Sequence, residues 1–77
     1  MKVNVKLMSI FAKYSKEDDN GKTEIKDGGT VLDIVRELGL PEKQVRLIAV
    51  NGRQSGINTV LSEDDTIFIF PPAAGGG

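Results

Sequence analysis

The sequence predicts an α+β domain in which a mixed sheet of about five strands is covered on one face by one main helix. Three observations predict this fold. Short stretches of alternating polar and apolar residues begin and end the chain, one stretch between them has helical apolar spacing, and Gly, Pro, Asn and Asp separate the stretches. We expect one domain over residues 1–70 and a flexible Gly-rich tail over residues 71–77.

The first part of the chain predicts two paired strands. Polar and apolar residues alternate from Lys2 to Leu7, which is typical of a half-buried strand. A short helical turn is expected within 9–16, and the polar stretch 17–22 contains the turn dipeptide Asn20-Gly21. Residues 23–26 alternate again and are expected to pair antiparallel with the first strand.

The main helix is predicted over Val31–Leu38. Apolar residues at positions 31, 34, 35 and 38 form one helical stripe, and Thr30 stands before it as the N-cap. Asp33 is at the third helical position, where its carboxylate can accept hydrogen bonds from the first turn. Gly39 fits the left-handed C-cap, and Pro41 prevents the helix from continuing.

The second half of the chain predicts three more strands. Residues 46–50 and 53–55 flank Asn51-Gly52, a strong hairpin signal, and Thr66–Phe70 forms the last strand. Residues 56–62 are expected to be irregular. This segment is expected to supply three side chains to the core: Ile57, Val60 and Leu61.

Composition excludes most functions that depend on a side chain or a metal. The chain has no Cys and no His, which removes disulfides, structural zinc, thiol nucleophiles and the usual acid–base residue. Acidic residues at 18–19 and 63–65 are adjacent in polar turns and are interpreted as solvated. We therefore expect no enzymatic activity, no metal and no stably bound cofactor.

Charge and hydropathy also limit the partners. The net charge of −1 does not favour nucleic acid, and no apolar stretch is long enough to span a membrane. The N-terminus lacks the apolar region of a signal peptide, so we expect a cytoplasmic protein.

The last strand is expected to present aromatic rings to a partner. If Ile67 and Ile69 point into the core, alternation places Phe68 and Phe70 on the opposite face. Exposed aromatic rings on a strand favour an interface, to which Lys43 and Arg53 could add charge at the rim. The alternatives are that the 10–14 segment covers the rings or that the register is reversed.

The C-terminus is the remaining candidate site. Pro71 and Pro72 have no amide hydrogen and end the sheet, and Ala73, Ala74, Gly75, Gly76 and Gly77 follow. A terminal carboxylate on three glycines is free of side-chain obstruction, so it can enter a narrow active site of a partner. The alternative is an inert, frayed end.

Several motifs together resemble one family. The order of elements, Val50-Asn51-Gly52, Leu38-Gly39-Leu40-Pro41 and the ending Phe70–Gly77 with Phe-Pro-Pro-x-x-Gly-Gly resemble the MoaD/ThiS sulfur carriers, and the ending is most similar to MoaD, the small subunit of molybdopterin synthase. The resemblance implies a β-grasp, ubiquitin-like fold. It covers the whole chain, but the family usually ends at the second glycine, so either Gly76 or Gly77 is the reactive residue.

The resemblance implies a function for the tail. An E1-like adenylyltransferase (MoeB/ThiF-like) uses ATP to adenylate the terminal glycine, and sulfur from a persulfide converts it to a thiocarboxylate. The sulfur then passes to the molybdopterin synthase large subunit (MoaE-like), for molybdopterin or the tungsten cofactor. Alternatives are thiamin, cysteine or tRNA thiolation pathways, a protein modifier joined to lysines, or a binding domain with an inert tail.

Overall fold

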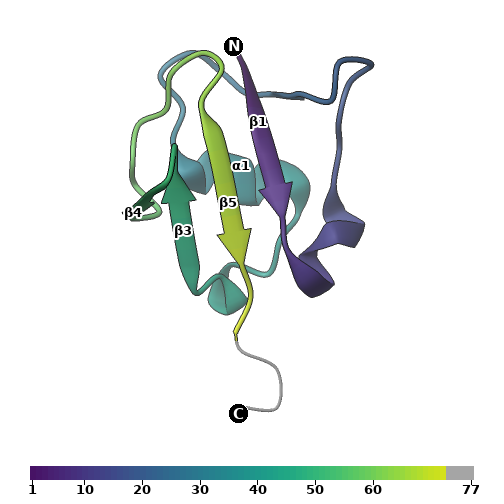
Figure 1. Cartoon of the computed structure of the whole chain (residues 1–77), viewed down its shortest axis with the longest axis vertical. Helices are drawn as coiled ribbons and strands as arrows, with labels where there is room; N and C mark the ends of the chain where they lie inside the picture. Colours follow the sequence, from purple (N-terminus) through teal and green to yellow (C-terminus); the bar gives the residue numbers. More distant parts are fainter. Residues whose placement is uncertain (73–77) are drawn as a thin grey trace.

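The structure is a computed structural model that describes residues 1–72, so residues 73–77 of the predicted tail lie outside the described residues. Five strands form one sheet, and α1 (Val31–Leu38) lies behind it in Figure 1. The strands are β1 (Lys2–Leu7), β2 (Thr23–Glu24), β3 (Leu47–Val50), β4 (Arg53–Ser55) and β5 (Thr66–Phe70). Two 3₁₀ helices, η1 (Ser9–Tyr14) and η2 (Glu42–Gln44), connect them.

The last strand of the chain occupies the centre of the sheet. The spatial order is β2-β1-β5-β3-β4, with β1 parallel to β5 and every other neighbouring pair antiparallel. Because β5 is bonded on both sides, its two faces are fixed by two independent registers. The predicted mixed sheet with one main helix is confirmed.

The core lies between α1 and the sheet. Its largest side chains with less than 2% exposure are Phe11, Ile34, Ile67, Ile69, Val3, Val31 and Val35. Each such side chain contributes roughly 1.5–3 kcal/mol through burial, so this layer dominates the stability of a small domain. Phe11 reaches the core from η1, which explains why that short helix is ordered beside β1.

Both ends of α1 have the predicted capping residues. The Asp33 carboxylate accepts hydrogen bonds from the Thr30 amide at 2.8 Å and the Thr30 hydroxyl at 3.3 Å. The amide contact is the main reason that the pKa of Asp33 is lowered. Gly39 has φ of 73°, and the Leu40 amide donates to the Val35 carbonyl at 2.9 Å. A left-handed glycine therefore ends the helix, as predicted.

Three sequence-based expectations differ from the structure. Val60 is 66% exposed and does not belong to the core, because it lies in an extended segment where the adjacent Leu61 points inward instead. The second strand is limited to Thr23–Glu24, which pairs with Lys2 and Val3, although Ile25 also exchanges backbone hydrogen bonds with Met1. The third strand begins at Leu47 rather than at residue 46. Leu61 is buried and Ile57 packs partly against the core, as predicted.

No helix within residues 1–72 has the length and apolar character that a membrane span requires.

Candidate functional site: the open face of the sheet

The sheet has one face that α1 does not cover, and its central strands are apolar there. Phe70 pairs with Leu47, and Phe68 pairs with Ala49, so these four side chains lie on the same face. We call these four residues the apolar patch. Ile67 and Ile69, at 0% exposure, point to α1, which confirms the predicted orientation of β5.

The two rings of the apolar patch lie side by side. Their centroids are 6.4 Å apart with an interplanar angle of 19°, and both rings are half-buried. Leu47 beside them is 40% exposed. The segment 10–14 does not bury the rings, because Phe11 of that segment is in the core and Ile10 is exposed. A cluster of partly exposed aromatic and aliphatic groups is typical of a binding surface.

The chain leaves the sheet directly beside this patch. The Arg46 amide donates to the Phe70 carbonyl at 3.1 Å. Pro71 is half-buried and Pro72 is exposed, and neither has an amide hydrogen to extend the ladder. The predicted reactive residues Gly76 and Gly77, and the preceding Ala73, Ala74 and Gly75, lie outside the described residues.

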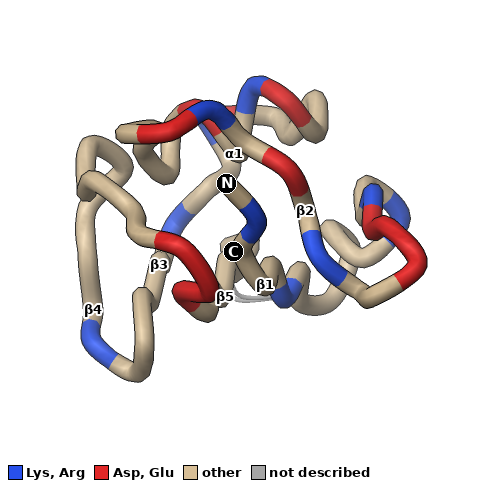
Figure 2. Tube along the Cα trace, turned by 90° about the horizontal axis from the view of Figure 1, so that it is seen from above, with Lys and Arg blue, Asp and Glu red and all other residues tan. Residues whose placement is uncertain are grey.

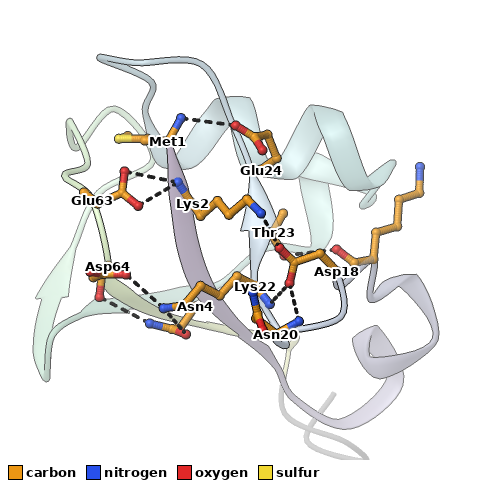
Figure 3. Close-up of polar contacts among 11 residues, drawn as sticks. Met1, Lys2, Asn4, Asp18, Asn20, Lys22, Thr23, Glu24, Glu63 and Asp64 are labelled. Atoms are coloured by element: carbon orange, nitrogen blue, oxygen red, sulfur yellow. Dashed lines mark hydrogen bonds and ion pairs between the residues drawn. The ribbon is translucent and has the colours of Figure 1, made fainter.

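The neighbouring half of the open face, on β1 and β2, is polar and internally bonded (Figure 3). The Lys2 ammonium lies 2.8 Å from the Asp18 carboxylate, which also accepts hydrogen bonds from the amides of Asn20 and Lys22. Together these contacts lower the pKa of Asp18 to about 2, and the contact with Lys2 is the largest cause. The carboxylate therefore holds the loop 15–22 against β1.

A second set of contacts joins β1 and the residue before β2 to the turn before β5. The Lys22 ammonium lies 2.9 Å from the Asp64 carboxylate and 3.4 Å from the Asn4 side-chain oxygen. The Asn4 amide group donates to the Asp64 carbonyl at 3.2 Å. We call Lys2, Asn4, Asp18, Lys22 and Asp64 the polar network. Asp18 and Asp64 are exposed in polar turns, as predicted, and each is in addition paired with a lysine.

Within residues 1–72, no group of three or more Asp, Glu, His or Cys side chains is placed to hold a metal ion. Lys43 and Arg53, predicted as rim charges, are exposed. Sequence reasoning missed Leu47 and Ala49, although alternation within 46–50 separates them from Ile48 and Val50 and could have identified them.

Comparisons with known proteins agree with this architecture. The model of the ThiS family matches residues 8–76. No curated protein matches the chain significantly. A putative molybdopterin converting factor, subunit 1, from Pyrococcus furiosus is 26% identical, with a TM-score of 0.67, and the match covers 94% of this chain and 98% of that one.

Two structures from Haloferax volcanii share the fold at lower identity. SAMP1, the small archaeal modifier protein 1, has a TM-score of 0.71 and 17% identity over 99% of this chain and 100% of that chain. The HVO 2177 protein has a TM-score of 0.72 and 24% identity over 99% of this chain and 87% of that chain. The fold is therefore the ubiquitin-like β-grasp, as the family resemblance implied.

Proposed function

We propose that this chain, which belongs to the ThiS family, carries sulfur as a thiocarboxylate on its C-terminal glycine. The proteins of this family are small ubiquitin-like carriers, so the chain acts as a substrate and subunit of other enzymes. An E1-like adenylyltransferase of the MoeB/ThiF type joins the terminal carboxylate to AMP and releases pyrophosphate from ATP. A persulfide sulfur then displaces AMP, and a thiol reductant cleaves the acyl disulfide to leave the thiocarboxylate.

The single observation that carries this proposal is the position of the apolar patch at the origin of the tail. The two aromatic residues of the patch lie on β5, the last strand, and the match to the family continues beyond that strand to residue 76. An enzyme that binds Phe68 and Phe70, with Pro71 and Pro72 beside them, therefore receives the tail at a fixed starting point. The ATP is used by that enzyme, and we propose no cofactor bound stably to the carrier.

The chemistry suits a chain that has no cysteine. A carboxylate is a poor electrophile because its negative charge repels nucleophiles, and a mixed anhydride with AMP removes that charge. The sulfur is then held by the terminal carbonyl, so the carrier needs no thiol of its own. Glycine residues near the end let the backbone enter a channel that would exclude a Cβ.

For the sulfur acceptor we propose the large subunit of molybdopterin synthase, a MoaE-like protein. The ending Phe70-Pro71-Pro72 followed by the glycines supports this choice. The Pyrococcus furiosus converting-factor subunit, 26% identical over nearly the whole chain, supports it as well. The proposed product is the dithiolene of molybdopterin or of the tungsten cofactor.

Intact-mass spectrometry tests the proposal directly. The purified chain is incubated with an E1-like adenylyltransferase from the same cells, ATP, a persulfide-loaded sulfurtransferase and a thiol reductant. We expect the mass change of one oxygen replaced by one sulfur, and sulfur transfer when a MoaE-like subunit and the molybdopterin precursor are added. The mass also shows whether Gly77 is retained.

Two truncated chains serve as controls. A chain that ends at Gly76 retains the reaction if Gly76 is the reactive residue, whereas a chain that ends at Ala74 must lose it. An unmodified terminus in the intact chain under all conditions would refute the carrier proposal. Isopeptide conjugates to lysines without any thiocarboxylate would favour the modifier alternative instead.

A further inference from the structure

Lys6 lies at the boundary between the two halves of the open face. On β1 it pairs with Phe68 of β5, which in turn pairs with Ala49 of β3, so the three side chains form one row across the sheet. Lys6 is exposed. Within residues 1–72 its ammonium group takes part in no ion pair and no hydrogen bond.

The two neighbouring lysines of this region differ from Lys6 in that respect. Lys2 has Asp18 at 2.8 Å, and Lys22 has Asp64 at 2.9 Å. Each lysine of the polar network is thus paired with a carboxylate of the described residues, whereas Lys6, beside the apolar patch, is not. A partner that covers Phe68 removes water from Lys6 as well. That removal is unfavourable for a cation unless the partner supplies an opposite charge.

A hollow beside Lys6 has room for such a charge. It has a volume of about 270 Å³ and is lined by Val5, Lys6, Leu7, Met8, Ala12, Ser15 and Glu17. Glu17 is its one acidic residue, and its carboxylate accepts a hydrogen bond from the Ser15 hydroxyl at 3.1 Å. No ion pair joins Glu17 to Lys6. The hollow therefore has an available cation at its wall.

The distribution of acidic residues along the chain favours the region of the sheet near Lys6 as the place where an acidic group of a partner docks. Glu63, Asp64 and Asp65 directly precede β5, and Figure 2 shows a red segment near that strand. The tail leaves from the other end of β5, at Phe70. An acidic group on a partner is repelled from the start of β5 and attracted toward Lys6, so these charges give the docking a direction.

We propose that the adenylating enzyme presents an Asp or Glu carboxylate to Lys6, at the hollow, when its apolar surface covers Phe68 and Phe70. This inference rests on the proposed function and adds the chemistry of the partner surface. Lys6 is a specificity-determining residue that sets the association rate and the register of docking, and the reacting atoms are remote from it.

Charge reversal tests the inference. In an adenylation assay with the E1-like enzyme, we expect Lys6→Glu to reduce kcat/KM roughly 10-fold or more at low salt and Lys6→Met to reduce it about 3-fold. The activity of the native chain should fall as NaCl increases, because salt screens the pair, and that dependence should be weaker in Lys6→Met. Arg36→Glu, an equal charge change on α1 behind the sheet, is the matched control and should have little effect.

Different results separate this inference from the proposed function. If the native chain is never adenylated, the proposed function fails. If it is adenylated and Lys6→Glu equals Arg36→Glu, the Lys6 inference alone is overturned. Thermal unfolding of each variant identifies a folding defect. If Lys6→Glu is unfolded, the salt dependence of adenylation is compared between Lys6→Met and the native chain. An equal dependence in the two chains overturns the Lys6 inference. An Asp or Glu to Lys change on the enzyme that restores Lys6→Glu would identify the opposing carboxylate.

Discussion

The two halves of the open face differ in how the rest of the chain contacts their side chains. On β1 and β2, the polar network joins residues distant in sequence, such as Lys2 with Asp18 and Lys22 with Asp64, and a loop is held over the strand. On β5 and β3, two half-buried rings and a 40% exposed leucine face outward, and no loop of residues 1–72 buries them.

The difference shows which half is available for binding. Polar groups that are already paired within the chain gain little from a partner, because the same bonds would only be exchanged. Apolar groups in contact with water gain roughly 25 cal/mol for each Å² that a partner covers. The polar half therefore contributes to folding. The apolar half is the surface whose burial by a partner is favourable.

The largest expected effect separates the two faces of β5. Phe70→Ser should lower kcat/KM for adenylation roughly 100-fold, since an aromatic residue at the centre of an interface is a frequent hot spot. Its effect on stability should be small because the ring points away from the core. Ile69→Ala on the same strand should instead destabilise the domain by about 2–5 kcal/mol, because it removes core packing.

Adenylation kinetics and thermal unfolding of both variants provide the measurement. The comparison breaks if Phe70→Ser unfolds as easily as Ile69→Ala, because the ring would then belong to the core. It also breaks if Phe70→Ser is adenylated at the native rate, in which case the apolar patch is not the surface that the enzyme binds.

An intermediate effect is expected in the polar half. Asp18→Asn removes the charge that holds Lys2 and weakens the acceptor for the amides of Asn20 and Lys22. We expect Tm to fall by roughly 2–5 °C, with adenylation unchanged. The neighbouring Asp19→Asn is the matched control, since the Asp19 side chain has no hydrogen bond within residues 1–72. Equal Tm values for the two variants would show that the network contributes nothing to stability.

Much of the fold was predictable because it depends on local signals. Alternation, caps and turn dipeptides correctly identified the five strands and the bounds of α1. These signals act over a few residues, so they do not require knowledge of which strands are neighbours. The exposed side of β5 was also predictable, since a two-residue period fixes one face once the other is buried.

The remaining features depend on contacts between distant residues. The pairing of Lys6 with Phe68 follows from the parallel register of β1 and β5, which no local pattern specifies. The same is true of the ion pair between Lys22 and Asp64, which are 42 residues apart in sequence. Val60 was placed wrongly because hydrophobicity alone does not tell which of two adjacent residues in an extended segment points inward.

The smallest expected effect is the acid dependence of the polar network. The pKa of Asp18 is lowered from 3.8 to about 2, chiefly by its contact with Lys2. A lowered pKa means that the folded chain binds this proton less readily than the unfolded chain. Its stabilising contribution is therefore complete well above pH 3.8, declines below that value and is lost as the pH falls through about 2.

Urea unfolding across this pH range isolates the contribution of Asp18. The stability of the native chain should fall between about pH 5 and pH 2, and part of that fall should be absent in Asp18→Asn, which has no proton to gain. The other part should remain, because the lowered pKa of Asp33 acts in the same direction at α1. Parallel curves for the native chain and Asp18→Asn would contradict the ion pair with Lys2.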